Sequence, residues 1–572
     1  MSKPFARALI LLSILLNRTK STKIVTRIPS TVVIEGSSIL EAVVAFFAYI
    51  VESFTASVLE NPRTTPCGSR NVQDHDNSEI EPLLVQQRFT LEEFTKFDPN
   101  DTIFQEFDPP FGACGSMAWK DSRPSRWTSF VSCFRAIFPM QLIIGSSIGL
   151  LAIAVAVVDF NTAHLCYQET FRWNSMLRVI QSVEVISQSV EGFIVELWHF
   201  SIMLCMFGYS VLKDLNLLAI NLLAAFVDAS YRLCLQIFGI YKQPWTSYPL
   251  NVLFTVVVFG NSIIIAKHLM SSHTPVQEQT KTKLLKLTFL LGLQFLMGIP
   301  AAFVLVYSIS PWYNSKSEME KVFIAGVCPL LLSLPKVIAR VLAPKFELVH
   351  PGLLYLLVGC LYSSSAIVFR VMQAELTSFG LFVALGVGHA VIDLLKRLTV
   401  TMRDYIWDFM YKILFRCNRS QTFTFSPRNS RTPRSKRFVA DVSIQLLLTE
   451  PTALVRAVGF IYVYKFMYPD VSNQPVSDLI WGFIERCVTG LAIDVVFNTV
   501  SVWLQVTLFN VAVLKVWNSH KWRAHVIANA VCTLMTVLYF TEYLFDIVRR
   551  KHGNHMAKRF AFNCFRPFSR NS

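Results

Sequence analysis

Charged residues are scarce in this sequence. Asp, Glu, Lys and Arg make up only 16% of its 572 residues, whereas hydrophobic residues make up 53%. A soluble chain normally carries about 25% charged and about 45–50% apolar residues. The shortage of charge argues against a soluble enzyme and against a disordered protein. It favours a protein that has lipid as most of its solvent.

Motifs for metal, disulfide and nucleotide chemistry are missing as well. The twelve cysteines are scattered singly, with no C-x-x-C pair, so neither a zinc site nor a disulfide framework is expected. We find no phosphate-binding P-loop, no G-x-S-x-G and no H-E-x-x-H. A TVGYG-like ion filter and a voltage-sensing arginine series are also absent. The sequence therefore predicts no enzymatic activity, no cofactor and no metal.

Long hydrophobic runs recur from residue 139 onwards. A helix needs about 20 apolar residues to cross about 30 Å of hydrocarbon. The runs predict an all-α, polytopic membrane bundle of about ten transmembrane helices: 139–158, 193–212, 215–238, 250–266, 287–308, 322–341, 353–372, 378–395, 488–513 and 526–548. Pro300 and Pro335 lie inside two of these runs and are expected to kink their helices.

Basic residues indicate the orientation and the partners. The net charge is +15, and the Lys and Arg residues cluster beside the apolar runs, which points to the lipid bilayer rather than to nucleic acid. Four of them lie between residues 120 and 135, and seven lie in the tail 549–572, which has no acidic residue. Since Lys and Arg accumulate on the cytosolic side, both termini are expected to be cytosolic.

An eleventh run, 451–467, contains Arg456 and Lys465. Two cytosolic termini require an even number of spans, so we expect that this run does not cross the membrane. Lys515, Lys521 and Arg523 would then lie on the outer side, which the preference of basic residues for the cytosol disfavours.

The chain is predicted to have five parts. They are a cytosolic N-terminal region with interfacial helices and an irregular acidic segment (1–135), a first transmembrane bundle of about eight spans (136–395), an interfacial helix with a polybasic loop (396–437), a C-terminal membrane part of two or three spans (438–548) and a basic cytosolic tail (549–572).

Two features of the cytosolic parts predict partners. Glu79, Leu83 and Leu84 form a pattern that resembles the acidic dileucine signal, which clathrin adaptors use to sort membrane proteins to endosomes and lysosomes. This favours an endolysosomal membrane or the plasma membrane. The basic residues in 416–437 and in the tail are suited to binding anionic lipids, although they also fit simple topology determination.

Ionisable residues inside the apolar runs are the candidate functional site, because burying them in a membrane is unfavourable. Three pairs have helical spacing and so share a helix face: Glu196 with His199, Asp228 with Arg232, and His389 with Asp393. Further charges of this kind are Lys336, Glu485, Arg486 and Asp494. Local charge pairing inside the bundle is the structural alternative for each of them.

Three functions remain open from the sequence. A transporter or channel for a small solute or ion would use these polar residues to line a path. A receptor or sensor for small molecules and a non-catalytic membrane scaffold are the alternatives. We favour the first. Of the charged residues, His389 is the candidate for a proton-sensitive role, since its neighbours Gly386 and Gly388 would allow close approach of another helix, and a structural salt bridge with Asp393 is the alternative.

Overall fold

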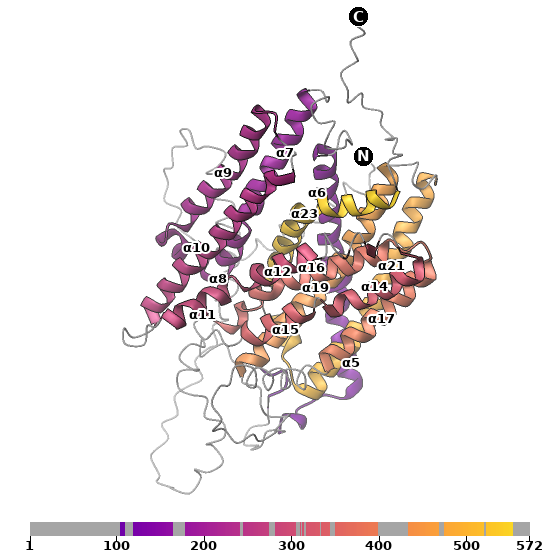
Figure 1. Cartoon of the computed structure of the whole chain (residues 1–572). Helices are drawn as coiled ribbons and strands as arrows, with labels where there is room; N and C mark the ends of the chain where they lie inside the picture. Colours follow the sequence, from indigo (N-terminus) through magenta and orange to yellow (C-terminus); the bar gives the residue numbers. More distant parts are fainter. Residues whose placement is uncertain are drawn as a thin grey trace, which may run out of the picture. The chain divides into compact units, whose positions relative to one another are not determined.

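Helices make up the regular structure of the described chain (Figure 1). The computed structural model describes residues 103–108, 118–163, 178–240, 244–273, 281–304, 309, 312–313, 316–331, 333–343, 349–398, 433–467, 474–519 and 522–552. No strand occurs among these residues, which confirms the all-α class for them. The dileucine pattern at Glu79, Leu83 and Leu84, the loop after residue 398 and the tail after residue 552 lie outside the described residues.

The helices of the described chain differ widely in length. In sequence order they are α5 (Arg126–Pro139), the π-helix η4 (Met140–Gly145), α6 (Ser146–Ala163), α7 (Arg178–Glu196), α8 (Trp198–Asp214), α9 (Leu217–Ile237), α10 (Tyr248–His273), α11 (Lys281–Leu291), α12 (Leu293–Val304), α14 (Glu318–Leu331), α15 (Ser333–Leu342), α16 (Leu356–Ala374), α17 (Phe379–Leu398), α19 (Pro433–Met467), α21 (Val476–Phe509), α22 (Val513–Asn518) and α23 (Trp522–His552). Short 3₁₀ turns cover Ala118–Lys120, Pro244–Ser247 and Pro351–Leu353.

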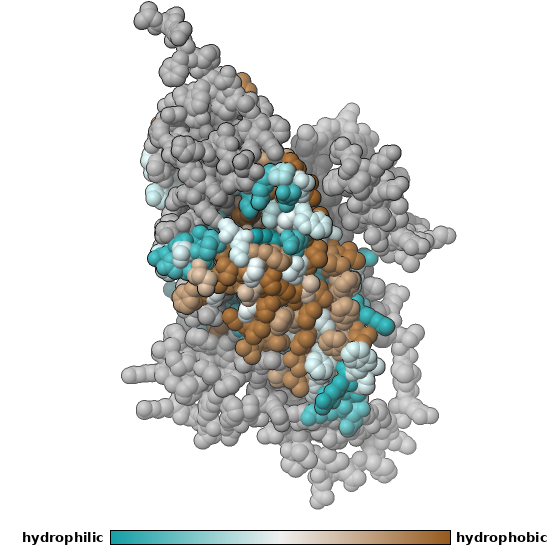
Figure 2. All heavy atoms as spheres, turned by 90° about the vertical axis from the view of Figure 1, so that its right-hand side faces the viewer, coloured by the Kyte–Doolittle hydropathy of each residue, from teal (hydrophilic) through white to brown (hydrophobic). Residues whose placement is uncertain are grey.

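Eight segments of the described chain are long and apolar enough to cross a membrane. They are Arg126–Val158, Gln181–Asp214, Leu217–Ile237, Trp245–Ser271, Pro351–Ala374, Phe379–Arg397, Arg434–Phe466 and Val476–Phe509. Their apolar character extends to the outer surface: Figure 2 shows a broad hydrophobic area with hydrophilic patches above and below it. On α21 the exposed residues Ile480, Ile484 and Val488 repeat every four positions and form an outward stripe. Such a surface is consistent with an integral membrane protein.

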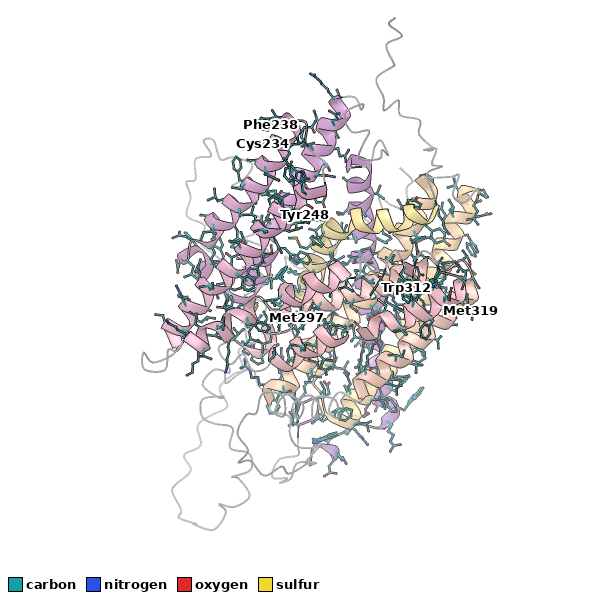
Figure 3. All side chains as sticks on the ribbon, in the orientation of Figure 1. Cys234, Phe238, Tyr248, Met297, Trp312 and Met319 are labelled. Atoms are coloured by element: carbon teal, nitrogen blue, oxygen red, sulfur yellow. The ribbon has the colours of Figure 1, made fainter. Side chains whose placement is uncertain are left out.

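Exposed aromatic side chains lie near several helix ends. Phe238 follows α9 and Tyr248 begins α10, and both are largely exposed (Figure 3). Trp127 lies in the first turn of α5 and Trp481 in the second turn of α21, and both are exposed as well. Trp and Tyr are enriched where a membrane meets water, so these positions agree with membrane-facing helix ends.

The run 451–467, which was expected not to cross, belongs to a segment that is long and apolar enough to cross a membrane. It is the second half of α19, which is one of the eight segments and is, with α16, the most enclosed of them, since 83% of its apolar window is buried. Residues 433–437, predicted to belong to the polybasic loop, form its first turn. The expectation weighed Arg456 and Lys465 as membrane charges, whereas Arg456 is enclosed by protein and Lys465 stacks over Tyr462.

Three other predicted runs are interrupted. The run 193–212 is broken at Leu197 between α7 and α8, and α8 bends again at Gly208, whose φ of 77° favours a residue without a side chain. In the run 287–308, α11 ends at Leu291 and α12 begins at Leu293, passing through Pro300. In the run 322–341, α15 begins at Ser333, two residues before Pro335. These runs predict helices correctly but not their continuity.

Helices α16 and α19 form the centre of the fold and lie side by side (Figure 1). One core cluster packs α16 against α8, α12 and α23, and another packs α16 and α19 against α21 around Phe382, Leu454 and Tyr464. A third packs α19 and α21 against α5 and η4. Because protein surrounds α19 on all sides, its polar side chains can find partners on other helices.

The segment 103–108 docks where α21 ends. Asn510, which adopts a left-handed φ of 51°, accepts a hydrogen bond from the Phe107 amide and donates one to its carbonyl. The Glu106 carboxylate accepts hydrogen bonds from the amides of Leu514 and Lys515 at the start of α22, and burial raises the pKa of this carboxyl above its ordinary value. Lys515 also pairs with Asp108 at 2.7 Å. Lys515 therefore lies on the same side as the segment before α5, contrary to its expected outward position.

Candidate functional site

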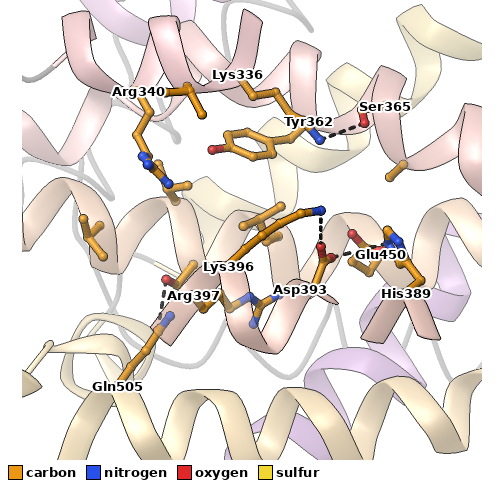
Figure 4. Close-up of a pocket in the computed structure, with 16 residues that line it drawn as sticks. Lys336, Arg340, Tyr362, Ser365, His389, Asp393, Lys396, Arg397, Glu450 and Gln505 are labelled. Carbon is orange, nitrogen blue, oxygen red and sulfur yellow. Dashed lines mark hydrogen bonds and ion pairs between the residues drawn. The ribbon is translucent and has the colours of Figure 1, made fainter. Parts of the chain in front are cut away.

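A small cavity lies between α15, α16, α17, α19 and α21 (Figure 4). Its volume is about 90 Å³, which is room for a few water-sized groups, since one water occupies about 30 Å³ in the liquid. The polar lining consists of Lys336, Arg340, Tyr362, Ser365, His389, Asp393, Lys396, Arg397, Ser443, Glu450 and Gln505. Val, Ala and Leu side chains complete it.

A buried ion network adjoins the cavity through Glu450. Arg370 of α16 donates to both carboxylate oxygens of Asp494 on α21, at 2.7 and 2.8 Å, and to Glu450 of α19 at 3.3 Å. Its other terminal nitrogen donates to Gln373, whose own amide donates to the Phe382 carbonyl. The three charged side chains are at most 9% exposed. One arginine thus ties three helices together and compensates two carboxylates.

The predicted pair His389 and Asp393 lines the cavity beside this network. His389 Nε2 lies 3.4 Å from Asp393 Oδ2 and 3.9 Å from Glu450 Oε2, so the histidine stands between two carboxylates. Its ring stacks on Phe369 with centroids 3.8 Å apart. Asp393 is also paired with Lys396 at 2.8 Å. The i, i+4 pair expected from sequence is present, and it belongs to a larger cluster.

Cations dominate the rest of the lining. Lys336 of α15 donates to Ser365 of α16 at 2.8 Å, and Arg340 follows one turn later on α15. Lys396 and Arg397 stand in the last turn of α17. The Nη1 atom of Arg397 is buried and has no hydrogen-bond partner among the described residues.

The other four predicted residues lie in the α7–α10 part and do not reach this cavity. Asp228 and Arg232 on α9 form an ion pair at 2.6 Å, and Gly192 of α7 packs directly against it. Glu196, at the end of α7, interacts electrostatically with both members of the pair, and its Oε2 atom is buried without a hydrogen-bond partner among the described residues.

His199 belongs to a separate polar cluster. It is the second residue of α8, beyond the break at Leu197, so it does not share a continuous helix with Glu196. Its ring nitrogens contact Asn261 at 3.3 Å and Ser262 at 3.4 Å, both on α10. Asn261 and Asn221 of α9 exchange two hydrogen bonds of about 3 Å. The six predicted residues are therefore divided among three clusters, and only His389 and Asp393 line the cavity.

Sequence reasoning missed Arg370 and Glu450. Arg370 lies inside the apolar run 353–372, so the criterion that selected the other charges would have found it. Glu450 immediately precedes the run 451–467 and only joins the site because α19 continues through it. Arg486, which was selected, donates to the carbonyls of Ala374 and Thr377 and thereby caps the end of α16. That position fits a structural role.

The carboxylates of the cavity do not form a convincing metal site. Ligand atoms of His389, Asp393 and Glu450 lie within 4.8 Å of one another. However, Lys396 pairs with Asp393 and Arg370 donates to Glu450, and a divalent cation placed there would be repelled by both basic side chains. The site is better suited to holding negative charge.

No protein-family model, curated protein or solved structure matches this chain. The described residues form a helical bundle with eight segments apolar enough to cross a membrane and with a cavity lined by charged side chains. The function of the protein has to be inferred from the chemistry of that cavity.

Proposed function

We propose that the protein is a multi-pass membrane transporter or channel for a small solute or ion, and that the cavity between α15, α16, α17, α19 and α21 is its binding site. The observation that supports this proposal is that seven Lys, Arg, His, Asp and Glu residues line one cavity. Charges inside a helix bundle are unfavourable and commonly mark substrate or ion pathways. The proposal rests on the cavity and not on convergence of the six expected residues, which fall into three clusters.

A small-molecule sensor is the second candidate, because the same cavity could bind a ligand without releasing it on the other side. A pure scaffold explains the cavity less well. The interlocking of Arg370, Asp494 and Glu450 would suffice to join α16, α19 and α21, without a further set of cations around an open space.

We place about ten spans in the membrane, with the N-terminal region cytosolic. If each of the eight segments crosses once, the N-terminal region lies on the same side of the membrane as the basic connection 267–286, the basic region 396–437 and Lys515. The Lys and Arg residues of these parts favour the cytosolic side. The pairs α11–α12 and α14–α15 supply two further crossings. The cavity then lies towards the cytosolic ends of α17 and α21, near Lys396 and Gln505.

The basic tail supports a cytosolic C-terminus, which requires that α23 does not cross. Protease protection of terminal tags in sealed vesicles tests this. Both tags should be cleaved from the cytosolic side, and a protected C-terminal tag would show that α23 crosses.

The test of transport uses purified protein in sealed liposomes. Uptake of small anions and cations, with and without a pH gradient, should exceed that of empty liposomes for at least one solute. The variant His389→Gln keeps polarity but cannot titrate, so any dependence of uptake on pH between about 5 and 8 that arises from this ring should disappear. Binding without uptake would favour the sensor.

For localisation, we propose the endolysosomal system or the plasma membrane from which the protein is retrieved. Replacing Leu83 and Leu84 by Ala should shift a tagged protein towards the cell surface, because an adaptor-read address is removed. An unchanged distribution would show that the pattern is not used.

A further inference from the structure

We propose that the cavity binds a small oxyanion, namely a phosphate group or a group of the same size and charge. This inference rests on the proposed function for its location in a membrane bundle and names the class of its substrate. The observations that carry it are the sign of the lining charge, one unpartnered guanidinium nitrogen and the size of the space.

The charges that surround the cavity are mainly positive. Lys336, Arg340, Lys396 and Arg397 line it, against the carboxylates of Asp393 and Glu450. Adding the network at its edge brings in one more cation, Arg370, and one more carboxylate, Asp494. The cavity lining and the adjoining network thus contain five cations and three carboxylates among the described residues. In a low-dielectric interior, such an excess attracts an anion strongly.

The carboxylates do not cancel this attraction, because Lys396 and Arg370 offset two of their three negative charges and three further cations remain. Asp393 is held by Lys396 at 2.8 Å, and Glu450 and Asp494 share Arg370. An incoming anion does not need to displace these pairings. Lys336, Arg340 and Arg397 add positive charge beyond them, from two helices on different sides of the cavity (Figure 4).

Arg397 is the second, independent observation. Arg397 is 8% exposed, and its Nη1 atom has no hydrogen-bond partner among the described residues. A buried donor without a partner is unfavourable by about 1–3 kcal/mol, and more for a charged group. A cation in the last turn of a helix is normally explained by the negative end of the helix dipole, but here the guanidinium lines the cavity. A ligand oxygen would supply the missing acceptor, and guanidinium groups suit phosphate and carboxylate oxygens.

The cavity volume of about 90 Å³ limits the ligand. Pockets for drug-sized molecules are about 300–1,000 Å³. The space therefore suits an inorganic oxyanion or the phosphate group of a lipid whose remainder lies outside the cavity. Both sources share the same chemistry, and the experiment separates them.

The experiment measures binding to the full-length protein in nanodiscs at low salt. Inorganic phosphate is titrated, with chloride as a monovalent comparison, and phosphatidic acid is added in a second arm and followed by native mass spectrometry. The variants are Arg397→Gln, which removes the unpartnered donor, and Arg397→Lys, which keeps the charge without the planar fork. Arg178→Gln is the matched control, since Arg178 is an exposed arginine at the start of α7.

We expect saturable phosphate binding that Arg397→Gln weakens at least tenfold, that Arg397→Lys weakens less, and that Arg178→Gln leaves unchanged. Binding of phosphatidic acid but not of phosphate, with the same dependence on Arg397, would assign the site to a lipid headgroup. Absence of both kinds of binding, or equal binding to all variants, overturns the inference. If the wild-type protein binds phosphate but liposomes show no uptake, the proposed transport is wrong while the oxyanion site stands. If liposomes take up another solute but the protein binds no oxyanion, the oxyanion site is wrong while the proposed transport stands.

Discussion

The two halves of the bundle handle buried polar groups in different ways. In the α7–α10 part, Asp228 pairs with Arg232 on the same helix, and Asn221 pairs with Asn261 on the next one. Around α16 and α19, one arginine serves carboxylates from two other helices, and several cations line an open cavity. These two pairs of the α7–α10 part are made between near neighbours in sequence or on adjacent helices. The arrangement around α16 and α19 joins distant parts of the chain and leaves capacity for a ligand.

The difference shows that a charge pair inside an apolar run does not by itself reveal which other charges it will meet. Asp228–Arg232 and His389–Asp393 have the same i, i+4 spacing in sequence. Only the second pair meets charges from other helices, because α19 passes beside α17 and brings Glu450 to within 3.9 Å of His389. Breaking each arrangement separately should therefore have different consequences.

The largest effect is expected from Arg370→Met. This change leaves Asp494 and Glu450 buried without their cation, and removal of one partner of a buried ion pair destabilises a protein by about 3–5 kcal/mol. The comparison is Arg232→Met, which should destabilise less, because the Arg232 side chain is 23% exposed whereas that of Arg370 is 2% exposed. The thermal unfolding midpoint of each variant in detergent measures the difference.

The double variant Arg370→Met with Asp494→Asn serves as a check. Removing one of the uncompensated charges should recover part of the loss if the charge itself is the cause. Equal losses in Arg370→Met and Arg232→Met, or a double variant that is worse by the full sum, would contradict the distinction between the two regions.

An intermediate effect is expected from Gly386→Ala on α17. A Cβ at this position would lie 2.7 Å from the Gln373 amide nitrogen. Gln373 cannot move freely, because it is fully buried and bonded to both Arg370 and the Phe382 carbonyl. Overpacking of this kind destabilises by about 1–3 kcal/mol, and here it should also disturb Arg370.

Gly388→Ala is the matched control, since a Cβ there meets nothing within 4 Å. It should leave phosphate binding unchanged and keep or slightly raise the unfolding midpoint, because Ala favours a helix more than Gly does, whereas Gly386→Ala should lower both. A Gly388 variant as damaging as the Gly386 variant would show that helix flexibility, and not contact with Gln373, is what these glycines provide.

These two glycines also show how far the sequence could predict the site. Their spacing before His389 indicates a place of close helix approach, and Gly386 does lie against α16, but Gly388 faces open space. Hydrophobic runs predict most helices, because burial in lipid or protein demands them. They do not predict that Glu450 joins His389, since that depends on which helices become neighbours. Nor do they predict the break at Leu197, which separates Glu196 from His199.

The smallest effect concerns an exposed charge, in contrast to the buried ones. At the start of α14, the amide of Ser317 donates to Glu320 at 3.0 Å and its hydroxyl donates at 2.8 Å. These bonds stabilise the carboxylate and lower the pKa of Glu320 below its ordinary value of 4.5. A carboxyl whose pKa is depressed by folding stabilises the structure above its unfolded pKa, and this contribution is lost as the pH falls through the folded pKa.

Hydrogen exchange, corrected for its intrinsic pH dependence, should therefore show the first turn of α14 opening more at pH 3 than at pH 6. In Glu320→Gln, which keeps an acceptor oxygen but cannot titrate, the first turn should open equally at both values. If the wild-type turn also opens equally, the pairing of Ser317 with Glu320 does not hold this helix start.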